Sequence, residues 1–463
     1  MRILTLLALL TGLCGCHTDG VNSQSTAPAA PPERGPLPPA EAPDFTVTLR
    51  GAPAGEVLLI GHYMDQQFRA AEATADASGT VRFQREEPFE PGYYFAYYSD
   101  GSAAQFLLSE DQTFTLTADK DDVPGTARIT GQQDSELLYD GLRYEATLQP
   151  RFAAAGEDRS QRTALARERS EHYTRVFADH PDRFYTAYKR AGQNPEIRTD
   201  LSEQDQVTAY RYDFWEGVDF SDPRLLRTPV IANKLKRYIG TLTPQNADSI
   251  KRAADFLLAR VLDHPEYYQF IANNITLSYE PGKTQVMDGE AIHAHMIQNY
   301  FTRERAFWAD SMTVYGLQQR ADEMAHSLVG QPGPDITVPG LDGKPQRLYD
   351  LEQPYLIVYL YNPTCEHCIE ETPRLVEYAR GEPRVGVYAV ALDTERDEWR
   401  QFVRQYGLGD FTNVMDPTNR SIYKTYFVDN TPELYLLDRD RTIIAKNLKP
   451  AQVARAIEIA EGG

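Results

Sequence analysis

The chain has 463 residues and a formal net charge of −20 at pH 7. A chain of this length exceeds what one hydrophobic core can organise, so we expect roughly two to four domains. The acidic balance and the absence of any Lys/Arg-rich run exclude nucleic acid as a partner.

The N-terminus predicts export from the cytoplasm. Residues 1–15 contain one basic residue and then an apolar run too short to span a bilayer, as in a signal peptide. Leu13-Cys14-Gly15-Cys16 resembles a bacterial lipobox in which Cys16 accepts the lipid and becomes the new N-terminus. Cys14 fits this role less well because Leu13 precedes it. An ordinary signal peptide cleaved near Gly15 is the alternative.

Residues 16–43 are rich in Pro, Ala and Ser and contain almost no large apolar side chain. Such a segment cannot bury a core, so it predicts a semi-extended tether. A lipid on Cys16 would attach the chain to a membrane, and the tether would hold the rest of the chain away from that surface. We identify no other stretch long enough to be transmembrane.

Residues 44–131 predict an N-terminal β-sandwich. Short runs of alternating apolar and polar residues recur between turn signals near Gly79, Gly92 and Gly101, and they indicate about seven strands. His62 is a lone histidine in one of these strands, for which we expect a packing or surface role.

Residues 132–330 predict an all-α middle region. Glycine becomes rare there, and apolar residues recur at helical spacing; Ala254, Leu257, Leu258 and Val261 share one face. We expect about eight helices. This region could dimerise or recruit a partner, and the sequence does not decide between these roles.

Residues 331–463 alternate between strands and helices, which predicts an αβα layered domain with a mixed sheet. The whole chain is therefore expected to be a multidomain α+β protein. The predicted elements are a strand (355–361), a helix from about Glu366, a strand (385–392), a helix (395–406), a connecting stretch, two strands (434–437 and 442–445) and a last helix (450–461).

Two cysteines follow the apolar strand 355–361 at the point where the helix should begin. Asn362 and Pro363 break the strand, so Cys365 is expected at a helix N-terminus, where free N–H groups favour the thiolate and lower the pKa. Cys368, one turn further on, is within disulfide reach and is the natural resolving thiol. A bridge in so small a ring is constrained, and therefore reducible.

Three other interpretations of this cysteine pair compete with a redox site. Zinc would need two more ligands, and the remaining cysteines, Cys14 and Cys16, lie in the targeting segment, so we predict no metal and no cofactor. An inert disulfide is a poor staple across so short a loop. A peroxidatic site would need Thr three residues before the attacking cysteine, and Asn362 precedes Cys365 at that spacing.

Several motifs together give the C-terminal 130 or so residues a family resemblance. They resemble the thioredoxin-fold domain of TlpA/ResA-type exported thiol-disulfide oxidoreductases. The residues that carry this resemblance are Gly330–Asp335, Gly343-Lys344, Cys365-Glu366-His367-Cys368, Glu371, Pro373 and Thr431-Pro432.

The resemblance implies roles for residues outside the cysteine pair. Pro432 would be the cis-proline that faces the thiols, with Thr431 beside them, and Pro373 would kink the active-site helix. The β-rich and helical regions resemble those of lipoproteins from two-membrane bacteria. Since His17 replaces the Asp that can signal inner-membrane retention, we expect a cell-envelope lipoprotein of the outer membrane that faces the periplasm.

Two positions depart from the family pattern. Thr364 replaces the Trp that usually precedes the first cysteine, which makes the surface there less apolar. Tyr359 stands where thioredoxin has its buried Asp, and a tyrosine cannot accept a proton near neutral pH. Glu371 is then the nearest candidate base. On the same helix, protonated His367 would stabilise the Cys365 anion and Glu366 would oppose it.

The primary hypothesis is dithiol-disulfide exchange with protein or small-molecule thiols and disulfides outside the cytoplasm. We expect a reduction potential of roughly −270 to −120 mV. Reductase action would need an electron donor, such as a membrane partner. The alternatives are an envelope binding or scaffold lipoprotein that retains a thioredoxin-like domain, and a thiol peroxidase.

Overall fold

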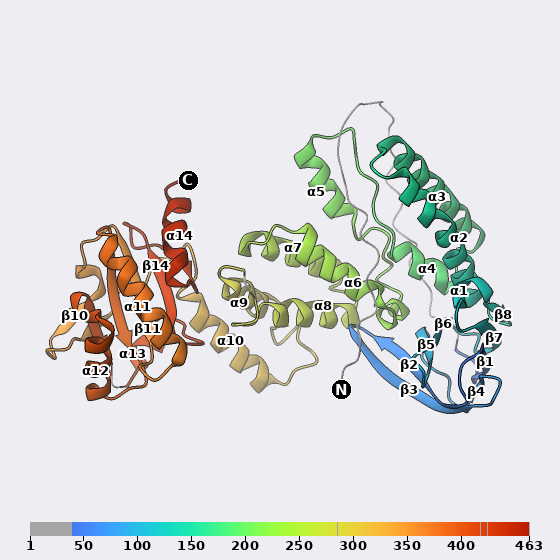
Figure 1. The fold of residues 1–463 in the computed structure, drawn as a ribbon, viewed down its shortest axis with the longest axis horizontal. Helices are drawn as coiled ribbons and strands as arrows, with labels where there is room; N and C mark the ends of the chain where they lie inside the picture. Colours follow the sequence, from blue (N-terminus) through green and yellow to red (C-terminus); the bar gives the residue numbers. More distant parts are fainter. Residues whose placement is uncertain (1–38, 285, 417, 424, 463) are drawn as a thin grey trace. The chain divides into compact units, whose positions relative to one another are not determined.

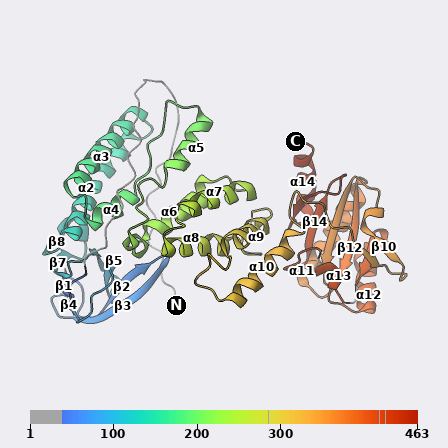
Figure 2. The same cartoon turned by 180° about the vertical axis from the view of Figure 1, so that it is seen from behind.

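The computed structural model describes residues 39–462 except 285, 417 and 424. The predicted signal peptide, Cys16 and most of the predicted tether lie outside the described residues. The internal contacts of the described residues divide into two compact units, with the boundary between Leu242 and Thr243. Figures 1 and 2 show the elements of both units, coloured along the sequence.

The β-rich part of the first unit consists of two four-stranded sheets with the orders β4-β1-β7-β8 and β3-β2-β5-β6. Every second residue of β1 is buried, as expected for a strand with one face on a core. The ring of Phe45 in β1 stacks on that of Phe114 in β7, with 4.8 Å between ring centres. It also contacts the ring of Phe106 in the other sheet, with 5.5 Å between ring centres, so both sheets share one core. The strands are β1 (Asp44–Arg50), β2 (Gly55–Tyr63), β3 (Gln66–Ala75), β4 (Thr80–Gln84), β5 (Gly92–Tyr98), β6 (Ala103–Leu108), β7 (Thr113–Asp119) and β8 (Arg128–Thr130).

Helices complete the first unit. They are α1 (Val123–Thr126), α2 (Gln133–Ala155), α3 (Arg159–Asp179), α4 (Phe184–Ala191), α5 (Glu203–Asp213) and α6 (Pro229–Arg237). A cluster of ion pairs joins the segment between α5 and α6 to the loop between β6 and β7. Arg224 bonds both carboxylate oxygens of Asp222, at 2.8 and 2.7 Å, and reaches Glu110 at 2.8 Å. Each charge in this cluster therefore has a close partner of opposite sign.

The second unit begins with four helices and continues into the αβα region. The helices are α7 (Ala247–Arg260), α8 (Pro265–Ser278), α9 (Gly289–Tyr300) and α10 (Ser311–Ala325). In the part of the chain that the structure describes, no helix is both long and apolar enough to cross a membrane.

A five-stranded mixed sheet of order β13-β12-β11-β14-β15 forms the centre of the αβα region. Strand β11 is parallel to β12 and antiparallel to β14, as the predicted mixed sheet requires. The elements are the hairpin β9 (Thr337–Pro339) and β10 (Pro345–Arg347), then β11 (Tyr355–Tyr361), α11 (Glu366–Gly381), β12 (Val385–Ala391), α12 (Arg396–Tyr406), β13 (Thr412–Met415), α13 (Arg420–Tyr423), β14 (Glu433–Leu437), β15 (Ile443–Lys446) and α14 (Val453–Ala460).

Helices α11, α12 and α14 cover one face of this sheet (Figure 1). The predicted last helix packs there through Val453 and Ile457, so that prediction is confirmed. The prediction of a connecting stretch without a strand between residues 406 and 434 was wrong, because β13 forms there and pairs with β12. Strand β13 has only four residues, too few to give a clear alternation in the sequence.

Candidate active site at the start of helix α11

A tight turn separates β11 from α11 and places Cys365 at the helix start. The Asn362 side-chain oxygen accepts hydrogen bonds from the backbone N–H and the hydroxyl of Thr364, both at 2.7 Å. The backbone N–H of Cys365 donates to the Asn362 carbonyl at 3.1 Å. Cys365 is thereby the N-cap residue of α11, where unpaired N–H groups of the first turn favour an anion.

The sulfur of Cys365 is partly exposed and has a lowered pKa. Burial raises the pKa, but hydrogen bonds from the backbone and thiol of Cys368, from Thr431 and from the backbone of His367 outweigh it. In the thiol form, Cys365 Sγ donates to the Thr431 carbonyl oxygen at 3.1 Å. Cys365 is therefore both accessible and more easily ionised than an ordinary thiol.

Cys368 lies one helical turn further on and has the opposite properties. Its side chain is 0% exposed, and burial raises its pKa to about 12. Both cysteines are free thiols in the structure. The site thus pairs a partly exposed, acidic thiol with a buried thiol that holds its proton at neutral pH.

The loop before β14 brings Thr431 and Pro432 to the thiols. The contact between Cys365 and the Thr431 carbonyl joins residues 66 positions apart. The Thr431–Pro432 peptide bond is cis. Strand β14 begins directly after it at Glu433, so the loop is anchored in the same sheet that carries α11.

The three other predicted site residues all lie on α11. Glu366 and His367 are exposed in its first turn. Glu371 is 8% exposed, and its carboxylate binds Arg374 Nη1 at 2.8 Å. Pro373 lies inside the helix. The structure therefore brings Cys365, Cys368, Thr431 and Pro432 together, and leaves Glu366 and His367 facing solvent.

Tyr359 lies beneath the helix and takes part in a hydrogen-bond chain that ends at Cys368. Its hydroxyl is 2.9 Å from Thr372 Oγ1, and Thr372 donates to the Cys368 carbonyl at 2.6 Å. Since the one hydroxyl proton of Thr372 is used in that second bond, Tyr359 must be the donor in the first. Burial raises the pKa of Tyr359 above its ordinary value, so the hydroxyl stays neutral.

On the opposite face of the sheet, the structure buries charged residues that sequence reasoning missed. Lys446 of β15 is 1% exposed, and its Nζ lies 3.8 Å from Glu290 of α9. Glu433 is 8% exposed, and Glu433 Oε1 has no hydrogen-bond partner. Burial raises the pKa of Glu433 to about 8 against the opposing charge of Lys446. In the sequence, the signal for this buried charge was the position of Glu433, directly after the predicted cis-proline Pro432.

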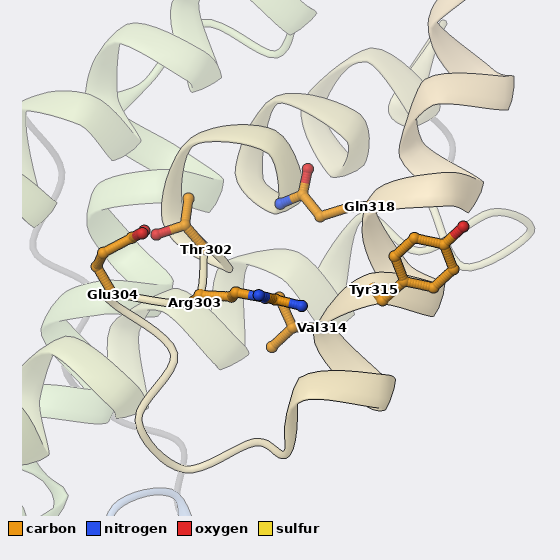
Figure 3. A pocket seen from close by; sticks show the side chains of 6 residues that line it. All are labelled: Thr302, Arg303, Glu304, Val314, Tyr315 and Gln318. Atoms are coloured by element: carbon orange, nitrogen blue, oxygen red, sulfur yellow. The ribbon is translucent and has the colours of Figure 1, made fainter.

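A separate cavity of about 220 Å³ lies between the loop after α9 and helix α10 (Figure 3). It is lined by Thr302, Arg303, Glu304, Val314, Tyr315 and Gln318. None of these six side chains carries a thiol. Within residues 39–462, leaving aside the three omitted positions, no group of three or more His, Cys, Asp or Glu side chains could hold a metal ion.

An acidic N-cap thiol, a buried thiol one turn later and a neighbouring cis-proline define the class of thioredoxin-like proteins. The model of the AhpC/TSA family matches residues 329–446. Thiol-disulfide oxidoreductase ResA from Bacillus cereus is 30% identical over 120 residues, which is 26% of this chain and 68% of that protein. The chain therefore belongs to the thioredoxin-like family of thiol-disulfide oxidoreductases, and it is an enzyme of that kind.

Two further comparisons found similar proteins. The probable thiol:disulfide interchange protein DsbE-2 from Pasteurella multocida is 28% identical over 27% of this chain and 65% of that protein. The solved structure of a thioredoxin-like protein from Bacteroides caccae covers 58% of this chain and 98% of its own, at 17% identity and a TM-score of 0.49. The chain combines its thioredoxin-like domain with a β-rich N-terminal region and a helical middle region.

Proposed function

We propose that this protein exchanges dithiol and disulfide with protein or small-molecule substrates outside the cytoplasm. The observation that carries the proposal is the contrast between two sulfurs one turn apart. The pKa of partly exposed Cys365 is lowered, whereas burial raises the pKa of Cys368 to about 12. Only the first thiol is ready to attack an incoming disulfide, and only the second is shielded until a mixed disulfide has formed.

The reaction runs in two exchange steps. The Cys365 thiolate attacks one sulfur of the substrate disulfide, that bond breaks, and the other substrate sulfur leaves as a thiolate. Cys368 then loses its proton and attacks Cys365 Sγ, and the second substrate sulfur leaves and takes up a proton. The first leaving thiolate takes a proton from solvent, which balances the proton that Cys365 lost when it ionised. The substrate thus gains two electrons and two protons, and Cys365 and Cys368 become a disulfide.

Residues around the thiols have proposed supporting roles. Glu371 lies within one turn of Cys368 and is our candidate base for its proton, although it must then share its carboxylate with Arg374 at 2.8 Å. His367, when protonated, would favour the Cys365 anion, and Glu366 would oppose it. Thr431 and Pro432 would present backbone to the substrate chain, beside the attacked sulfur.

The proposal also includes the cellular location of the protein and the bounds of its domains. Export, lipidation at Cys16 and a tether over residues 16–43 would hold the enzyme on a membrane of the cell envelope, facing the periplasm. We propose a signal peptide (1–15), a β-sandwich domain (44–131), a helical region (132–330) and the thioredoxin-like domain (331–463). Because the oxidised pair must be reduced again, turnover as a reductase needs a donor such as a membrane electron carrier.

Reduction of insulin disulfides by the full chain tests the activity. We expect turnover by the wild type with a thiol donor, and a loss of at least about a hundredfold in Cys365→Ser, because that sulfur forms the mixed disulfide. Cys368→Ala should instead accumulate covalent complexes with substrates. Equal rates for wild type and Cys365→Ser would favour a binding or scaffold role, and consumption of peroxide would favour a thiol peroxidase.

A further inference from the structure

The loop that delivers Thr431 to Cys365 is held at its start by the end of helix α10. The hydroxyl of Ser327, just after α10, accepts a hydrogen bond from the Phe427 backbone N–H at 3.0 Å. Tyr435 lies 3.2 Å from the same hydroxyl and donates to the Phe427 carbonyl at 2.5 Å. Ser327 and Tyr435 are both 0% exposed, so water does not compete for these bonds.

Helix α10 holds the middle of the loop through a second residue. Arg320 Nη2 lies 2.8 Å from Asp429 Oδ1, and the Arg320 guanidinium stands 5.1 Å from the centre of the Phe427 ring. The side chains of Arg320 and Asp429 are 51% and 28% exposed, so this ion pair alone contributes little to stability. The ion pair holds the loop at Asp429, two residues before Thr431, and the hydrogen bonds of Phe427 already hold the start of the same loop.

We propose that Ser327 and Arg320 are positioning residues of the redox site, which hold the loop 427–431 where Thr431 meets the sulfur of Cys365. The 3.1 Å contact between Cys365 and the Thr431 carbonyl is then fixed by a helix more than 30 residues upstream of the thiols. The helical segment of the second unit thereby becomes part of the thiol site. This inference uses the proposed function only in taking Cys365 as the nucleophile.

The test measures the thiolate titration of Cys365 in the full chain, by the pH dependence of alkylation. The groups that bond this sulfur come from α11, as Cys368 and His367, and from the loop, as Thr431. The Thr431 carbonyl accepts a hydrogen bond from the Cys365 thiol, and the Thr431 side chain lowers the pKa of that thiol, so a loop held less firmly should shift the midpoint of the titration. We expect Arg320→Met and Ser327→Ala to change the alkylation rate at pH 7 two- to fivefold, through a shifted midpoint.

Further variants distinguish a specific effect on the position of Thr431 from a general loss of folding. Arg320→Lys keeps the charge and should retain most of the wild-type titration. Asp429→Asn should reproduce Arg320→Met, and the double variant should add nothing to either. Arg455→Met removes an exposed ion pair with Glu458 elsewhere in the same unit and should leave the midpoint unchanged.

An unchanged midpoint in both Ser327→Ala and Arg320→Met, with native circular dichroism, would overturn the proposal. If Arg320→Met fails to fold, Asp429→Asn decides by the same measurement. The readout needs no turnover. A wild type that titrates normally but reduces no disulfide would therefore count against the proposed function and leave this inference standing.

Discussion

The two faces of the five-stranded sheet bury polar groups of different kinds. On the face covered by α11, the hydroxyls of Tyr359 and Thr372 lead to Cys368, and all are neutral at pH 7. On the opposite face, Lys446 and Glu433 are buried beside Glu290 of α9. The two thiols thus lie on the neutral face, and the buried charges lie where the sheet meets the helical segment.

This difference explains why Cys368 stays protonated. Burial raises the pKa of Cys368 to about 12, because the hydrogen bonds from the Asn362 backbone and the Thr431 side chain that lower it are weaker than the cost of burying a charge. A buried lysine on that face would lower this pKa and make the second thiol compete with the first. Placing Lys446 on the other face avoids that competition.

The largest expected effect is on the charged face. Lys446→Met removes the cation of a buried pair and leaves the carboxylate of Glu290 with Asn447 as its remaining described partner, at 2.9 and 3.1 Å. Breaking a buried pair in this way typically costs about 3–5 kcal/mol of unfolding free energy. Urea unfolding of the full chain measures this loss. A change below about 1 kcal/mol would show that the cluster is hydrated and that the faces do not differ as described.

On the thiol face, the two sulfurs should differ in alkylation rate at pH 7. Cys365 has a lowered pKa and partial exposure, whereas the pKa of Cys368 is about 12 and its side chain is buried. We expect Cys365 to react at least about a hundredfold faster, since the thiolate is the reactive form. Peptide mass spectrometry of the reduced wild type, quenched over time, measures both rates. Equal rates would contradict the proposed division of roles.

Sequence reasoning located the neutral face more successfully than the charged one. The continuous apolar run 355–361 predicts β11 with its observed bounds, because a strand buried on both faces needs no alternation. Glu433 and Lys446 are charged residues in strands, which normally mark exposed positions. Their burial depends on Glu290, about 150 positions away in the sequence, and no local pattern contains that information.

A smaller effect should appear in the pH dependence of stability. Burial raises the pKa of Glu433 from 4.5 to about 8, so the folded chain binds more protons than the unfolded chain between these values. The contribution of Glu433 to the unfolding free energy therefore falls as the pH rises from about 4.5 to 8, by at most about 1.4 kcal/mol per pH unit. Glu433→Gln should remove this slope and be more stable than the wild type above pH 8.

Urea unfolding at several pH values from 5 to 9 measures the slope for each variant. Glu458→Gln is the matched control, because the side chain of Glu458 is 60% exposed. Identical slopes in the wild type and in Glu433→Gln would mean that Glu433 is ionised across this range. Glu433 would then be a charged member of an ion cluster, like the carboxylates that bind Arg224 in the first unit.

The smallest effect tests whether the neutral face takes part in chemistry. Tyr359→Phe removes the donor to Thr372, and loss of one such bond costs about 1 kcal/mol of unfolding free energy. Insulin reduction at pH 7 should change less than twofold, because a hydroxyl with a raised pKa exchanges no proton there. Tyr355→Phe is the control on the same strand, since its hydroxyl bonds Glu461 at an exposed site. A tenfold loss of activity in Tyr359→Phe alone, at unchanged stability, would instead make this tyrosine a participant in the deprotonation of Cys368.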